Sequence, residues 1–82
     1  MTFDRQTTVV QMRTGERGRI IEIAGGYGLT RRLEAMGIRS GKEITKVSSM
    51  LMRGPVTIQV DGAQVAIGFG MARRILVELE SK

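Results

Sequence analysis

The sequence predicts a mainly β protein, folded as one small barrel of about five short strands. Its 82 residues leave room for a single domain, residues 1–82, with one small core. Its 11 glycines, single except for the pair at 25 and 26, fall between short apolar runs, which is typical of turns between strands. Only one segment repeats its apolar residues with helical spacing. Strongly bent strands around so small a core close most easily as a barrel.

The first third of the chain predicts a turn, a loop and a strand. Residues 8–12 read as one helical turn with Thr8 as its cap. Residues 13–18 follow as a loop that contains two glycines. Residues 19–24 carry three isoleucines in four positions, which indicates a strand covered in part on both faces.

The one helical pattern follows the glycines at 25–28. Leu29, Leu33 and Met36 recur at i, i+4 and i+7, so they share one face, and core packing is the expected role of Met36. Gly37 stands where a helix ends in a left-handed residue. Ile38 is expected to fold back onto the helix end.

A second turn at Gly41 precedes a strand over residues 43–49. In that strand Ile44 and Val47 are three positions apart, which predicts a bulge. Gly54, followed by proline, marks the next turn.

The last third predicts a hairpin, a helical turn and a closing strand. Asp61 and Gly62 together are a type I′ turn signal between alternating apolar positions. The remaining expected elements are strands at 56–60 and 65–67, a helical turn at 71–74 and a last strand at 75–79.

Two residue types are missing, and this excludes several kinds of chemistry. The chain has no cysteine and no histidine, so the usual zinc, copper and haem ligand sets cannot form. The commonest nucleophile–base pairs are missing for the same reason. The acidic residues are scattered along the sequence and most adjoin Lys or Arg. We therefore expect no enzyme activity, no catalytic residues and no cofactor or metal site.

The net charge of +5 and a pI near 10.8 favour an anionic partner, although many small domains carry such a charge only for solubility. No apolar run approaches the roughly 18 residues of a membrane span. The N-terminal residues do not resemble a signal peptide. A cytoplasmic location is the expectation.

One block of residues is similar to a known family signature. Residues 33–41, Leu-Glu-Ala-Met-Gly-Ile-Arg-Ser-Gly, match the pattern Leu-x-x-Met-Gly-Ile-x-x-Gly of the ferrous iron transport protein A (FeoA) family. Residues 15–20 resemble the opening loop and strand of that family, and residues 55–77 resemble its hairpin and closing strand. The resemblance extends from about residue 8 to residue 80.

The resemblance implies an SH3-like barrel and a place in ferrous iron transport. The expected role is to bind the cytosolic part of a membrane ferrous iron transporter that carries a G-protein domain, and to modulate uptake. Iron would be the cargo of that system and not a tight ligand of this chain. We expect a monomer, peripheral at the inner face of the membrane and not itself spanning it.

Two segments are the candidate partner-binding residues. Met50, Leu51, Met52 and Arg53 form a flexible apolar loop that suits an adaptable docking surface. Arg31 and Arg32 add positive charge on the helix. The alternatives are that the loop folds over an open end of the barrel and that the arginines are merely solvated.

Two other functions remain open from the sequence. Small basic barrels often bind nucleic acid, but aromatic residues make up only 4% of this chain, which disfavours base stacking, so we expect no nucleic-acid partner. Domains similar to FeoA also stand at the C-terminus of metal-dependent repressors, so an accessory role beside such a repressor is the second alternative.

Overall fold

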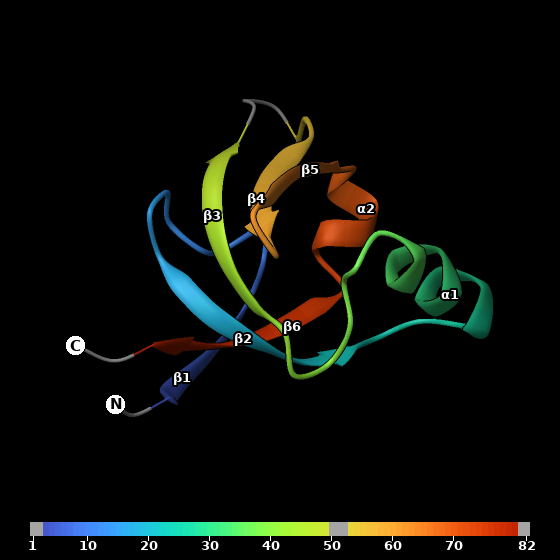
Figure 1. The fold of residues 1–82 in the computed structure, drawn as a ribbon, viewed down its shortest axis with the longest axis horizontal. Helices are drawn as coiled ribbons and strands as arrows, with labels where there is room; N and C mark the ends of the chain where they lie inside the picture. The colour runs from blue at the N-terminus through green and yellow to red at the C-terminus, as the bar shows by residue number, and fades with distance from the viewer. Residues whose placement is uncertain (1–2, 50–52, 81–82) are drawn as a thin grey trace.

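The backbone forms one antiparallel sheet that coils around an apolar core, with α1 beside it and α2 joining its last two strands (Figure 1). The computed structural model describes residues 3–49 and 53–80, with side chains from Arg5 onward. The strand order is β1-β6-β2-β3-β4-β5, so β1 and β5 are the two edges. The elements are β1 (Phe3–Thr8), β2 (Arg17–Ile23), α1 (Tyr27–Ala35), β3 (Glu43–Ser49), β4 (Val56–Val60), β5 (Ala63–Ile67), α2 (Phe69–Ala72) and β6 (Ile75–Glu80). The mainly β fold with two short helical segments is confirmed.

The described residues contain six strands, whereas the sequence predicted about five. The unpredicted strand is β1, whose residues are mostly polar and show no apolar alternation. It forms because it pairs with β6 along its length, with Phe3 opposite Glu80 and Thr8 opposite Leu76. An edge strand needs only one partner, and polar residues are tolerated there because its outer side is uncovered.

The turn predicted at residues 8–12 follows β1 directly. The N–H of Met12 donates to the Thr8 carbonyl at 3.1 Å, and the N–H of Gln11 lies 3.3 Å from the Thr8 hydroxyl. Thr8 therefore caps this turn as predicted, while its backbone also ends the strand.

Gly18 lies in β2 opposite Leu79 of β6. A Cβ at this position would collide with the side chain of Val77 and would lie 2.8 Å from the Glu78 carbonyl oxygen. Only glycine lets the two backbones approach this closely.

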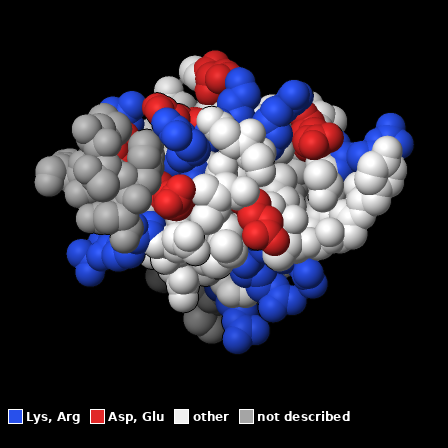
Figure 2. Space-filling model, turned by 90° about the horizontal axis from the view of Figure 1, so that it is seen from below, with Lys and Arg blue, Asp and Glu red and all other residues white. Residues whose placement is uncertain are grey.

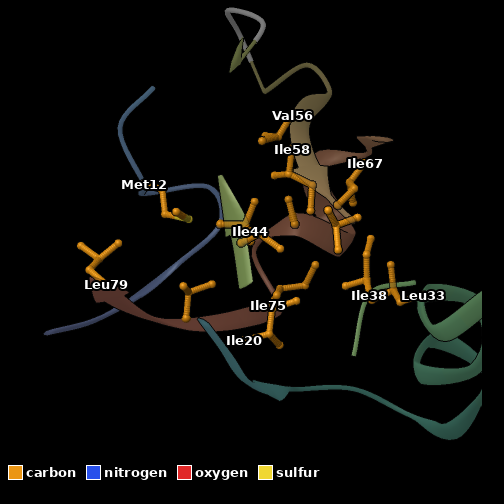
Figure 3. Packing of buried hydrophobic residues seen from close by; sticks show 14 residues of the cluster. Met12, Ile20, Leu33, Ile38, Ile44, Val56, Ile58, Ile67, Ile75 and Leu79 are labelled. Carbon is orange, nitrogen blue, oxygen red and sulfur yellow. The ribbon is translucent and has the colours of Figure 1, made fainter. Parts of the chain in front are cut away.

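The end of α1 is built by two residues that reverse the chain. Gly37 has φ +84°, and its N–H donates to the Glu34 carbonyl at 2.9 Å. The N–H of Ile38 reaches back to the Leu33 carbonyl at 3.0 Å, which completes a Schellman motif. Leu33 and Ile38 are both fully buried and lie side by side where the helix meets the core (Figure 3). The predicted left-handed Gly37 and the predicted return of Ile38 are confirmed.

β3 has the predicted bounds, and its pairing with β4 shifts register between Lys46 and Ser48. This irregularity confirms the expected bulge. The inward side chains differ from the prediction, however. Ile44 and Lys46 are buried, whereas Val47 is only partly buried.

The predicted turns are present. Gly41 has φ +93°, and Asp61 and Gly62 have φ 51° and φ 81°, as a type I′ hairpin turn requires. In the turn before β4, the positive φ falls on Arg53 at 63° and not on Gly54.

The helical turn predicted at 71–74 begins two residues earlier, as α2. Gly68 is extended and precedes the first helical residue, Phe69. The helix therefore includes Phe69 and Gly70, which precede the predicted turn. Arg73 and Arg74 therefore follow the helix rather than belonging to it.

The core gathers between the coiled sheet and the two helices (Figure 3). Met12 fills one end of the cluster, and Leu33 and Ile38 fill the end beside α1. The buried apolar residues among those described are Val9, Met12, Ile20, Leu33, Ile38, Ile44, Val56, Ile58, Val60, Ile67, Ala72, Ile75, Val77 and Leu79.

Gly37→Ala should destabilise the fold through backbone strain alone. The nearest atom to a Cβ there is a carboxylate oxygen of Asp61 at 4.0 Å, so no collision adds to the left-handed penalty of about 1–2 kcal/mol. Chemical denaturation of parent and variant measures this difference. Gly28→Ala is the matched control, because Gly28 is helical and open, and alanine there should stabilise by about 0.5–1 kcal/mol. Equal stability of parent and Gly37→Ala would contradict the account of this helix end.

Candidate functional site

Lys46 is the one buried charged side chain among the described residues, and its relative exposure is 1%. Its ammonium donates hydrogen bonds to three backbone carbonyls in the turn after β1: Val9 at 2.8 Å, Val10 at 3.0 Å and Met12 at 2.7 Å. An ammonium has three N–H groups and no acceptor, so its hydrogen-bonding capacity is fully used. This arrangement requires the protonated form, because a neutral amine has only two N–H groups.

Two opposing effects act on the proton of Lys46. Burial lowers the pKa of Lys46 below its ordinary value, while the Glu16 carboxylate raises it. Glu16 is held nearby because its backbone carbonyl accepts from the Lys46 N–H at 2.9 Å. Its carboxylate accepts from the N–H of Arg13 at 2.7 Å and from Arg5 at 3.3 Å. The three carbonyls around the ammonium act in the same direction as Glu16, because they bind the charged form.

The turn that Lys46 holds forms one wall of a hollow in the surface. Val10 lines the hollow from this turn together with the polar Thr8 and Gln11, Ala24 lines it from just after β2, and Phe69 from the start of α2. Arg73 and Arg74 line it from the segment between α2 and β6. The guanidinium of Arg74 lies 3.4 Å from the Ala24 carbonyl oxygen, and the Arg53 guanidinium lies 5.6 Å from the centroid of the Phe69 ring. The hollow thus combines apolar walls with arginines.

Positive and negative charges are distributed unevenly over the described residues. Their ion pairs join strands and the loops beside them: Arg5–Glu16, Arg17–Glu43, Arg17–Glu80, Arg19–Glu43 and Lys42–Asp61. The arginines of α1 and those after α2 take part in none of these pairs. Figure 2 shows basic and acidic side chains intermixed over the upper part of one face, with basic side chains gathered along its lower edge.

A second hollow lies beside the loop of residues 13–17. Both arginines and acids line it, including Arg13, Arg17, Glu16 and Glu80. Its charges are therefore balanced, unlike those of the hollow at Phe69.

The predicted docking residues lie in two places. Arg31 and Arg32 are exposed on α1, and the Arg31 guanidinium lies 5.5 Å from the ring centroid of Tyr27, which is 76% exposed. Arg53 is exposed at the start of the turn before β4. In Figure 1, α1 lies at the right, well apart from the adjoining ends of β3 and β4 at the top. The predicted residues Met50, Leu51 and Met52 lie outside the described residues.

The family model for the FeoA domain matches residues 7–79. The chain belongs to the FeoA family. A protein of Methanocaldococcus jannaschii that carries the name Fe(2+) transport protein A is 38% identical over 64 residues, which cover 78% of this chain and 76% of that protein. The name of this relative associates the FeoA family with ferrous iron transport.

Solved structures of FeoA proteins have the same fold as this chain. The crystal structure of an iron uptake regulatory protein (FeoA) superposes with a TM-score of 0.85 at 32% identity, covering 94% of this FeoA chain and 100% of the other. A FeoA-like protein from Clostridium acetobutylicum gives 0.82 at 23% identity, with coverage of 100% and 93%. A manganese-dependent transcriptional repressor gives 0.85 at 18% identity over 98% of this chain and 45% of its own, which shows a shared SH3-like fold alone.

Lys46 is the residue that the sequence reading missed. The alternation Ile44, Thr45, Lys46 places Lys46 on the same strand face as buried Ile44, which was the available signal. Lysine side chains are rarely buried, so the sequence favours apolar Val47 over Lys46 as the inward residue. The sequence alone does not predict that three backbone carbonyls would lie close enough to accept from a buried ammonium.

Lys46→Met should destabilise the protein by about 3 kcal/mol or more, because it leaves three carbonyls without their donor, at about 1–3 kcal/mol for each unsatisfied buried acceptor. A domain of this size has about 5 kcal/mol of stability, so the variant should be largely unfolded or melt at a much lower temperature. Thermal unfolding by circular dichroism measures the loss. Lys42→Met, which removes a partly exposed pair with Asp61 at 2.8 Å, should cost less than about 1 kcal/mol. If Lys46→Met and Lys42→Met lose equal stability, the buried hydrogen bonds of Lys46 contribute no more than an exposed ion pair.

We expect ferrous iron to be cargo of the system rather than a tight ligand of this chain. Across residues 3–49 and 53–80, no three Asp or Glu side chains come together as metal ligands would. Isolated carboxylates bind ferrous iron weakly without imidazole or thiolate. An anaerobic titration should therefore give a dissociation constant above about 10 μM. Stoichiometric binding tighter than this would show that the fold assembles a metal site from dispersed acids.

Proposed function

We propose that this FeoA protein docks on the cytosolic G-protein part of a membrane ferrous iron transporter and modulates iron uptake. Family membership supports the transport system, and the surface of α1 supports docking. Within the described part of the chain, neither helix is long enough or apolar enough to cross a membrane.

The observation that carries the proposal is the exposed face of α1. Tyr27 is the one large apolar side chain that is strongly exposed among the described residues, and Arg31 lies over its ring. Arg32 lies on the same exposed helix and takes part in none of the ion pairs above. An exposed aromatic ring beside arginines is the composition of a protein-binding surface, and it suits an acidic patch on the partner.

Arg31→Gln combined with Arg32→Gln should slow association with transporter-containing vesicles by about three- to tenfold at low salt. The change removes two positive charges from a net charge of +5, and it should also flatten the salt dependence of the association rate. Surface-based kinetics with and without guanine nucleotide is the measurement.

Arg5→Gln combined with Arg17→Gln is the matched control, since it removes the same charge from strands away from α1. If both double variants slow association equally, the slowing reflects the loss of net positive charge, and α1 is not the docking surface. Leu51→Asp tests the other predicted segment, and it should mainly accelerate dissociation. Should every variant bind and support uptake like the parent, the docking surface lies elsewhere.

A single-stranded RNA titration separates this proposal from the nucleic-acid alternative. Micromolar binding with a steep salt dependence would favour the nucleic-acid function. The repressor-linked alternative rests on the shared fold alone, and association with vesicles that contain the transporter would disfavour it.

A further inference from the structure

The hollow beside Phe69 has the features of a site for a short peptide. Its walls are apolar where Val10, Ala24 and the half-buried Phe69 meet. Its rim carries Arg73 and Arg74, both exposed. Neither arginine forms an ion pair with an acid anywhere in residues 3–49 and 53–80, so their charge is available to a partner.

Three arginines lie at or beside the single aromatic ring of this site. Arg53 lies over the Phe69 ring at 5.6 Å, while Arg73 and Arg74 line the hollow with that ring. The contact between Arg74 and the Ala24 carbonyl, at 3.4 Å, holds that side chain at the rim. A guanidinium binds carboxylates through paired N–H groups, so the charge here is complementary to acidic side chains.

The geometry favours a peptide over a nucleic acid. Base-stacking proteins offer open faces of several aromatic rings to successive bases. Here one ring lines the hollow, and Arg53 already occupies one of its faces. The apolar walls suit one aliphatic or aromatic side chain, and the arginines suit carboxylates on either side of it.

The hollow is also preformed. Val10 belongs to the turn whose carbonyls accept from the buried Lys46, at 3.0 Å from the Val10 oxygen itself. The backbone of Ala24, which also lines the hollow, is held by its N–H, which donates to the Arg74 carbonyl at 2.8 Å. A site with fixed walls loses little conformational freedom on binding, which favours recognition of a short segment.

From these observations we propose that the hollow formed by Val10, Ala24, Phe69, Arg73 and Arg74 binds an extended acidic segment of a partner protein, with one apolar side chain against Phe69. This site is separate from the face of α1, and it does not depend on which protein the partner is.

The test uses the full chain and a blocked peptide that has one phenylalanine flanked by two glutamates on each side. Nitrogen–proton spectra should show amide shifts at Val10, Ala24, Phe69 and Arg74 and none at Arg31. Replacing the four glutamates with glutamines, or the phenylalanine with serine, should weaken binding about tenfold. Shifts confined to α1, or no binding at millimolar peptide, would overturn the proposal.

Arginine variants test which positive charges bind the peptide. Arg73→Gln combined with Arg74→Gln should weaken peptide binding about tenfold, and the single Arg73→Gln variant, which loses no contact described above, guards against any folding effect. Arg31→Gln combined with Arg32→Gln removes the same charge from α1 and should leave peptide binding unchanged. Equal losses in the two double variants would show general attraction only and overturn the site. Binding of an oligothymidine in the hollow at least as tightly as the peptide would do the same.

Discussion

The N-terminal part of this structure depends on the hydrogen bonds that the Lys46 ammonium donates to three backbone carbonyls. A charge with 1% exposure is compatible with folding only because three carbonyls accept its three N–H groups. Those carbonyls belong to the turn that joins β1 to the core, where Val9 and Met12 are buried beside it. These hydrogen bonds satisfy both partners: the carbonyls of the turn gain donors, and the charged lysine gains acceptors.

The hydrogen bonds of Lys46 also affect the surface hollow at Phe69. The turn held by Lys46 supplies Val10 to the hollow at Phe69, while the ion pairs of the described strands leave the arginines of the helical side without acidic partners. Charge balance among the strands and charge excess beside the helices give the molecule two different kinds of surface. Such an uneven distribution suits binding to acidic partners.

Strong local signals were enough to predict much of the fold. The helix with its end at Gly37, the hairpin at Asp61 and Gly62 and the bulged third strand each depend on backbone rules that act within a few residues. β1 was missed because its polar residues become a strand only through pairing with β6, some 70 residues away in the chain. Lys46 was missed for the same reason, since its acceptors lie more than 30 residues earlier. Arg31 and Arg32 were located on the helix, but bringing Val10 and Ala24 to the same hollow as Phe69 depends on tertiary structure that joins distant parts of the chain.

Nitrogen-15 spectroscopy of the lysine side chains tests the central claim most directly. Ammonium protons on a protein surface exchange rapidly with water, whereas those bonded to three buried carbonyls should be protected. We predict that the Lys46 Nζ gives a resolved ammonium signal at neutral pH, with slow proton exchange and couplings to the carbonyls of Val9, Val10 and Met12, while the Nζ of partly exposed Lys42 does not. A Lys46 Nζ that exchanges as fast as that of Lys42, or that has the shift of a neutral amine at neutral pH, would contradict the account.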